Sequence, residues 1–234
     1  MCLICTEPPE SLIHATYIDC DNCPLLSIIP SILVNLQNLR CNHCENLKTI
    51  PSTLINLRTL NCSSCALLTH IPSTLVKLET LYCYNCPLIT SIPPTLINLR
   101  SILCWRCPNL NVISSTLVNL HSIGCSNCPL LTSIPSTLVN LSTLNCQNCL
   151  RLTYIPSTLI NLNLFISDGC YYMYIPFKIK QQCGLMTNNK IAIFANKLKR
   201  YYKRIRRKRM LCILNSDNKC IPSDLNAIIC SYLV

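Results

Sequence analysis

Apolar side chains recur along this chain with a constant period of 21 residues. Leucine marks two positions of each period, three residues apart, and the dipeptide Ile-Pro marks a third. The leucines lie at 33, 54, 75, 96, 117, 138 and 159, and again at 36, 57, 78, 99, 120, 141 and 162. Such a period predicts a stack of equal units, each of which buries its apolar side chains against its neighbours.

The unit that spans residues 36–56 shows which elements to expect. Apolar and polar residues alternate from Leu39 to Cys41, which predicts a short strand with one face toward a core. Pro51 lacks the N–H group that a strand ladder needs, so the chain turns there. The following S-T-L-x-N-L stretch is too short for a stable helix, and a helical turn or 3₁₀ segment is expected.

Written in full, the unit reads L-x-x-L-x-C-x-x-C-x-x-L-x-x-I-P-S-T-L-x-N, and it resembles a leucine-rich repeat. The resemblance covers residues 9–176, about eight units, of which the first is degenerate. It implies a horseshoe-shaped repeat solenoid of the α/β type, with a parallel β-sheet on the concave side and 3₁₀ or irregular segments on the convex side. Residues 1–8 are expected to form a truncated half repeat and residues 177–234 a basic, helical C-terminal cap or tail.

Seven C-x-x-C pairs occupy equivalent positions in the units, and any two neighbouring pairs have the spacing of a zinc site. Core packing is the favoured interpretation, with metal binding and thiol redox work as alternatives. Both cysteines fall at core positions of the repeat, and Ser167 replaces one of them in the last unit, which a packed ladder tolerates better than a metal site. We therefore expect no metal, no cofactor and a reducing, intracellular location, either cytoplasmic or nuclear.

The strand residues that point away from the core are mostly small or polar. The exceptions are Tyr82, Tyr84, Trp105 and Arg106 on neighbouring strands, and Arg40 is a further outward basic residue. Tyrosine, tryptophan and arginine dominate protein-binding hot spots, so these residues predict a protein partner on the concave face. The alternative is that the aromatic rings only stack on one another across the strands. No grouping of catalytic residues is present, and we expect a non-enzymatic scaffold.

The net charge of +11 comes entirely from the last 58 residues, because residues 1–176 carry seven basic and seven acidic side chains. Residues 188–210 have apolar residues at helical spacing and a dense basic run, formed by Lys203, Arg204, Arg206, Arg207, Lys208 and Arg209. Capping of the solenoid by this helix is the favoured interpretation. The alternatives are binding of nucleic acid, of an anionic membrane surface or of a nuclear import receptor.

A second helix is predicted at the end of the sequence, where Ser223 is suited to be its N-cap. Its residues resemble the opening helix of F-box motifs, and the matching positions are Pro222, Leu225, Ile228, Ile229, Tyr232 and Leu233. That resemblance implies docking to the adaptor subunit of a cullin-type ubiquitin ligase, and the alternative is a helix that closes the core.

The Asn/Ile/Lys-rich composition of the chain also resembles that of leucine-rich-repeat proteins of large DNA viruses. This resemblance implies that the protein is located in the cytoplasm of a host cell.

Overall fold

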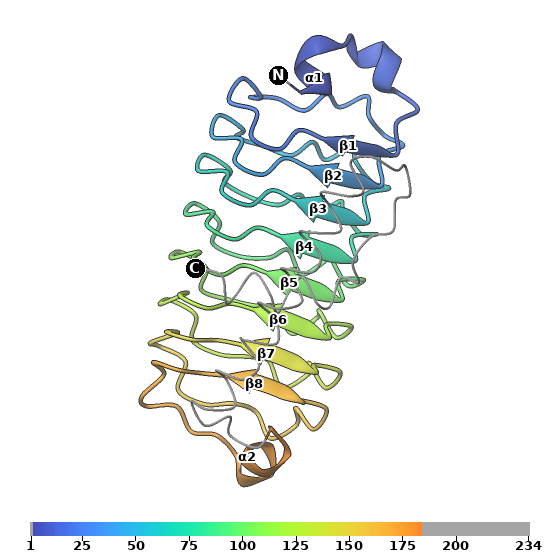
Figure 1. Ribbon diagram of the computed structural model, residues 1–234. Coiled ribbons are helices and arrows are strands. Elements are labelled where there is room, and N and C mark those ends of the chain that lie inside the picture. Colours follow the sequence, from blue (N-terminus) through green and yellow to red (C-terminus); the bar gives the residue numbers. More distant parts are fainter. Residues whose placement is uncertain (1, 184–234) are drawn as a thin grey trace, which may run out of the picture.

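The computed structural model describes residues 2–183 of the chain as a stack of short strands with a helical turn at each end (Figure 1). The elements are α1 (Leu3–Thr6), the 3₁₀ segment η1 (Pro9–Leu12), β1 (Tyr17–Asp19), β2 (Asn38–Arg40), β3 (Thr59–Asn61), β4 (Thr80–Tyr82), β5 (Ser101–Leu103), β6 (Ser122–Gly124), β7 (Thr143–Asn145), β8 (Leu164–Ile166) and α2 (Phe177–Cys183). Residues 177–183 are the part of the predicted C-terminal region that the structure describes.

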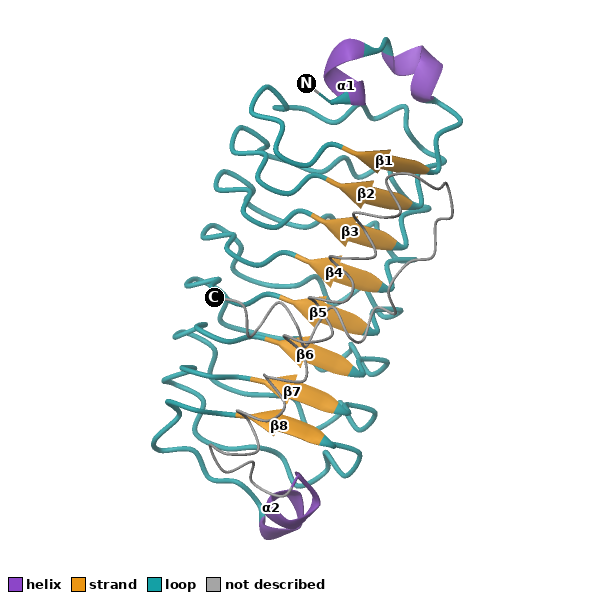
Figure 2. Cartoon of the chain, viewed as in Figure 1, coloured by secondary structure: helices purple, strands orange, loops and turns teal. Residues whose placement is uncertain are grey.

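The eight strands form one parallel sheet in sequence order, β1 to β8. Each residue pairs with the residue 21 positions later, as Leu39 does with Leu60 and Leu60 with Leu81. The strands line one side of the stack, and loops and turns make up the other side (Figure 2). This architecture confirms the repeat solenoid that the period predicts.

The core lies between the sheet and the loops and is built from rows of equivalent side chains. The middle residue of every strand faces it, and leucine, isoleucine and cysteine rows complete it. Both cysteines of each of the seven repeat pairs, from Cys20/Cys23 to Cys146/Cys149, are at most 2% exposed, so these thiols are core residues as expected. Since each unit exposes its apolar side chains unless a neighbour covers them, the rows make the stack depend on contacts between units.

The convex side consists of consecutive turns, in agreement with the 3₁₀ or irregular segments that the sequence predicts there. In the turns that follow Ile50, the N–H of Leu54 donates to the carbonyl of Pro51 (3.4 Å) and the N–H of Leu57 donates to the carbonyl of Leu54 (3.0 Å). Further side-chain bonds tie one unit to the next: Thr53 donates to the carbonyl of Ser31 and the Asn56 amide to that of Val34. These bonds satisfy backbone acceptors of the preceding unit, so regular helical bonding is not needed there.

The two ends of the described chain are covered by short helical segments. Residues 2–8, expected as half a repeat, contain α1. At the other end Ile179 of α2 is 1% exposed and joins the core, and the thiol of Cys183 donates to the carbonyl of Leu162. The capping helix in the described part therefore begins at Phe177. Within residues 2–183, the structure contains no helix with the length and apolarity to cross a bilayer.

Candidate functional site

The turn between the two cysteines of each pair positions the side chains that flank the concave sheet. The second intervening residue has a positive φ in every complete unit, and these residues are Asn22, His43, Ser64, Asn85, Arg106, Asn127 and Asn148. The second cysteine then donates its thiol hydrogen to the carbonyl of the first cysteine in the preceding unit, as Cys107 does to Cys83 (3.1 Å). The local geometry is thus repeated in each unit, and only the identity of the outward residue changes.

Four outward side chains in the middle of the sheet pack together into what we call the aromatic cluster: Tyr82, Tyr84, Leu103 and Trp105. The rings of Tyr84 and Trp105 are stacked, with centroids 4.2 Å apart and planes 3° from parallel. The guanidinium carbon of Arg106 lies 5.6 Å from the centroid of the Trp105 ring, within the range of a cation–π contact. The structure therefore brings together four of the five residues predicted to bind a partner.

Burial within the aromatic cluster is deeper than the outward direction of its strand positions suggests. Leu103 is fully buried and Trp105 is 7% exposed, whereas Tyr82 and Tyr84 are partly buried and Arg106 is exposed. Leu103 leans across the neighbouring strand, where a Cβ atom on Gly124 would lie 2.7 Å from its Cδ2 atom. The missing side chain at Gly124 thus makes the space into which Leu103 packs. The cross-strand stacking that the sequence left as an alternative is present in the structure.

Three buried polar atoms on the concave side of β5 to β7 have no hydrogen-bond partner among the described residues: Nε1 of Trp105, Oγ of Ser101 and Nδ2 of Asn145. Buried polar groups are satisfied in most native proteins, and an unsatisfied one costs about 1–3 kcal/mol. The middle of the concave face therefore carries hydrogen-bonding capacity that the described part of the chain does not use.

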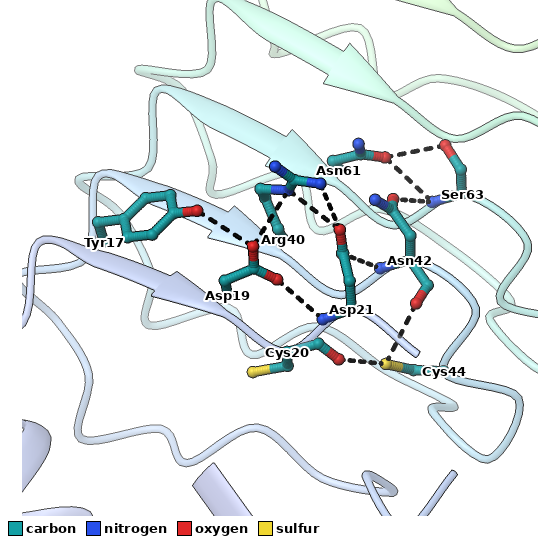
Figure 3. A network of polar contacts seen from close by, with 9 residues as sticks. All are labelled: Tyr17, Asp19, Cys20, Asp21, Arg40, Asn42, Cys44, Asn61 and Ser63. Carbon is teal, nitrogen blue, oxygen red and sulfur yellow. Dashed lines mark hydrogen bonds and ion pairs between the residues drawn. The ribbon is translucent and has the colours of Figure 1, made fainter. Parts of the chain in front are cut away.

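A polar network occupies the same face over β1 to β3 (Figure 3). Arg40 is ion-paired with Asp21, and its Nε also lies 3.6 Å from Asp19. The second carboxylate oxygen of Asp21 accepts the backbone N–H of Asn42 (2.8 Å), and the hydroxyl of Tyr17 donates to Asp19 (3.2 Å). Arg40, predicted to contact a partner, is thus already bonded within the sheet and lies apart from the aromatic cluster.

The carboxylates of this network also change the ionisation of their neighbours. Partial burial opposes the charged form of Arg40, but Asp21 and then Asp19 raise the pKa of its guanidinium above the ordinary value. Burial, with Asp19 beside it, raises the pKa of Tyr17. Arg40 therefore stays charged and Tyr17 stays protonated at neutral pH, which preserves the network.

The first cysteines of the ladder have the electrostatics of an inert core. Burial raises the pKa of Cys62 well above its ordinary value, and a hydrogen bond with the thiol of Cys107 together with burial does the same for Cys83. A buried thiol that keeps its proton is a poor nucleophile. These residues do not form a redox-reactive site on the concave face.

The remaining predicted site residues lie outside the described part of the chain. They are the basic run Lys203, Arg204, Arg206, Arg207, Lys208 and Arg209 and the F-box-like positions Pro222, Leu225, Ile228, Ile229, Tyr232 and Leu233. Sequence reasoning in turn missed the positive-φ position, although Asn recurs there in four units and is the non-glycine residue that best tolerates this conformation.

Comparison with known proteins bears on the fold. A sequence model described as Leucine Rich Repeat matches residues 56–78 and 77–99. No curated protein sequence matches the chain. Among solved structures, the leucine-rich repeat domain of the type III effector XopL is similar with a TM-score of 0.60 at 19% identity, over 74% of this chain and 68% of that one.

Two further solved structures cover similar shares of the chain with lower scores. The functional domain of InlJ from Listeria monocytogenes, which includes a cysteine ladder, has a TM-score of 0.28 and 21% identity over 74% of this chain and 58% of that one. A leucine-rich-repeat protein of Leptospira interrogans has a TM-score of 0.30 and 16% identity over 75% of this chain and 73% of that one. Taken with the 21-residue register and the parallel sheet, the repeat model and the XopL domain show that this chain contains leucine-rich repeats and folds as a leucine-rich-repeat solenoid.

Proposed function

We propose that this chain is a non-catalytic scaffold that binds a protein partner on its concave face, at the aromatic cluster and the adjoining Arg106. The observation that carries the proposal is the stacked pair of Tyr84 and Trp105 with the exposed guanidinium of Arg106 beside it. Such groups combine large contact area with a polar handle, and they are enriched where interfaces derive most of their binding energy.

The backbone of Arg106 supports a binding role over a purely structural one. Its φ is 57°, and the same position holds Asn in four other units and Gly169 in the last. Asparagine and glycine adopt this conformation readily, whereas arginine does so at a cost. An arginine kept at such a position is typical of a site where function opposes stability.

The test is affinity capture from an extract of the source cells with the full-length chain as bait, followed by mass spectrometry. Tyr84→Ala removes the ring that covers Trp105, and we expect it to weaken capture of the specific partner by about 1 kcal/mol or more, roughly five-fold. Tyr17→Ala is the matched control, because Tyr17 is an exposed tyrosine on the same face but belongs to the polar network at β1.

The two variants together distinguish binding from folding. Equal thermal unfolding of Tyr84→Ala and the parent, with loss of one captured protein that Tyr17→Ala retains, supports the proposal. Equal capture by all three proteins contradicts it, and so does a partner lost only with Tyr17→Ala. Trp105→Ala is a weaker first choice, because removal of a side chain that is 7% exposed also disturbs packing.

Two finer proposals rest on sequence alone, since they concern residues outside the described ones. An adaptor role in ubiquitin ligation depends on residues 220–234, and nucleic-acid binding depends on residues 188–210. Capture with and without residues 184–234 tests the first. A salt titration tests nucleic-acid binding: phosphate contacts lose affinity at least ten-fold between about 50 and 200 mM salt, whereas an aromatic contact changes little.

We further propose a reducing, intracellular location. In an oxidising compartment, thiols on strands about 4.8 Å apart are close enough to form disulfides.

A further inference from the structure

The N-terminal end of the cysteine ladder differs chemically from its interior. Within the units, each second cysteine donates its thiol hydrogen to a carbonyl of the unit before it, for example Cys44 to Cys20 (3.2 Å) and Cys65 to Cys41 (3.0 Å). Cys23 belongs to the first unit, so no earlier strand offers it that acceptor. The helical turn α1 lies there and brings the thiols of Cys2 and Cys5 against it.

The three sulfur atoms at this end form a compact triangle. Cys2 Sγ lies 3.7 Å from Cys5 Sγ, and Cys5 Sγ lies 3.6 Å from Cys23 Sγ. All three lie within 4.8 Å of one another, and among residues 2–183 this is the single group of three or more histidine, cysteine or acidic side chains arranged so closely. The thiols of the interior ladder, although more numerous, do not converge in this way.

The observed separations fit a tetrahedral thiolate site. Zinc binds cysteine sulfur at about 2.3 Å, and at the tetrahedral angle this places two sulfur ligands about 3.8 Å apart. The sulfur atoms are therefore already close to the positions that a zinc ion would require. The turn of α1 explains this: the N–H of Cys5 donates to the carbonyl of Cys2 (2.9 Å), which turns both side chains toward Cys23.

A fourth cysteine is available at the same place. Cys20 precedes Cys23 by three residues, but its sulfur is outside the group that lies within 4.8 Å, so it would join the site through a change of side-chain rotamer. The four residues have the spacing C-x₂-C-x₁₄-C-x₂-C, two knuckle-like pairs separated by the chain that forms η1 and β1. Cys2 and Cys5 are partly exposed, so an ion can reach the thiols from solvent.

We propose that Cys2, Cys5 and Cys23 bind a zinc ion, with Cys20 as the fourth ligand. The bound ion would replace the thiol protons, which pass to solvent, and would fasten α1 to the first repeat. The site lies apart from the concave face and is independent of the function proposed above. It departs from the expectation of no metal at this end alone: the pairs from Cys41/Cys44 to Cys146/Cys149 remain packed core thiols.

The experiment measures the metal content of the full-length protein, purified with reductant and without chelator or metal-affinity resin. Elemental analysis of the parent is expected to give about one zinc per chain, and Cys5→Ser is expected to lose it. Cys183→Ser is the matched control: Cys183 is also partly exposed, but it lies on α2 at the opposite end of the stack. Cobalt substitution of the parent should produce the intense thiolate-to-cobalt charge-transfer absorption of a tetrahedral sulfur site, absent from Cys5→Ser.

A readout that needs no mutation covers the case in which Cys5→Ser does not fold. The parent is alkylated with and without a chelator, and the modified cysteines are identified by peptide mass spectrometry. Chelation should expose Cys2 and Cys5 to alkylation while leaving Cys104 protected. The proposal is overturned if the parent binds neither zinc nor cobalt, if Cys5→Ser retains the metal, if chelator leaves Cys2 and Cys5 labelling unchanged, or if the mass shows a disulfide between them.

Discussion

The second cysteine of each pair illustrates how one side chain can serve both packing and hydrogen bonding. Its sulfur fills the core, as in Cys128, which is fully buried, while its hydrogen reaches the carbonyl of Cys104 in the unit before (3.1 Å). That carbonyl is a backbone acceptor at the point where the strand has ended, and leaving it unbonded would cost about 1–3 kcal/mol. The repeat thus uses a small, weakly polar residue where a larger apolar one would leave an acceptor unsatisfied.

Arg106 is expected to lower the stability of the fold, because its backbone has a positive φ. Arg106→Asn places the residue of four other units at the positive-φ position, and we expect the free energy of unfolding to rise by on the order of 1 kcal/mol. Urea denaturation followed by circular dichroism measures the change. The reverse substitution in the next unit, Asn127→Arg, should lower stability by a similar amount, and equal stability of all three proteins would contradict the strain argument.

Sequence reasoning identified the outward direction of the aromatic residues but not their burial. The two-residue alternation around Cys83 and Cys104 places Tyr82, Tyr84 and Trp105 on the concave face, because side chains alternate along a strand. The depth of Trp105 depends on Leu103 and on the space over Gly124, which are contacts between units that no single unit contains. Arg40 was assigned to a partner for the same reason: its bond to Asp21 joins two units.

At the scale of elements, the strands were predictable and the convex turns only in part. Pro51 and its equivalents begin the convex turns, as the sequence predicts, and side-chain bonds between units fix the path of these turns. The amide of Asn98 donates to the carbonyl of Val76 (2.7 Å), and Asn119 donates to that of Ile97 (2.9 Å). The recurring asparagine was visible in the sequence, whereas its acceptor, 22 residues earlier, became clear from the structure.

Lys77 interrupts this asparagine row and offers a way to test its value. Its ammonium group donates to Oδ1 of Asn56 (2.8 Å), on the surface, in place of an amide bond to the unit before. Lys77→Asn should restore a bond to the carbonyl of Ile55, and we expect stability to rise by about 0.5–1.5 kcal/mol, the net value of one hydrogen bond. Urea denaturation of Lys77→Asn and of Asn98→Ala should show changes of opposite sign; a loss of stability in both would contradict the prediction.

The 21-residue period did not predict the α1 turn. Cys2 lies 21 residues before Cys23 and so fits the repeat, which led to the expectation of half a unit over residues 1–8. Leu3–Thr6 is helical, and Cys5 occupies the repeat position that holds Leu26 and Leu47 in the following units. A residue outside the consensus was therefore the signal for the cysteine cluster at this end.

For the molecule as a whole, the rows of buried thiols make stability depend on alkaline pH. The pKa of Cys62, Cys104, Cys125 and Cys146 is raised well above the ordinary value of 9.0 in the folded chain. Above that pH the unfolded chain binds fewer protons than the folded one, so the free energy of unfolding falls as pH rises. Below it both states are protonated, and these thiols give no pH dependence.

The expected slope is steep because many thiols act together. Each raised thiol contributes up to about 1.4 kcal/mol of lost stability per pH unit above the unfolded-state pKa. The melting temperature should fall sharply above about pH 9, and Cys104→Ala should reduce the slope by one thiol's share. A melting temperature that is unchanged up to pH 11 would contradict this prediction, because it would show that folding does not raise the pKa of these thiols.

The constant register has a consequence for how such a molecule can change in size. Because each strand residue pairs with its counterpart one period away, and the repeated thiol and asparagine bonds span constant offsets of 24 and 22 residues, excision of 21 consecutive residues from the middle would leave equivalent backbone partners on both sides of the junction. The same holds for duplication, which would lengthen the sheet by about 4.8 Å per copy. The breadth of the sheet can therefore grow or shrink by gene rearrangement in whole steps of one repeat, while the pattern of core side chains is retained.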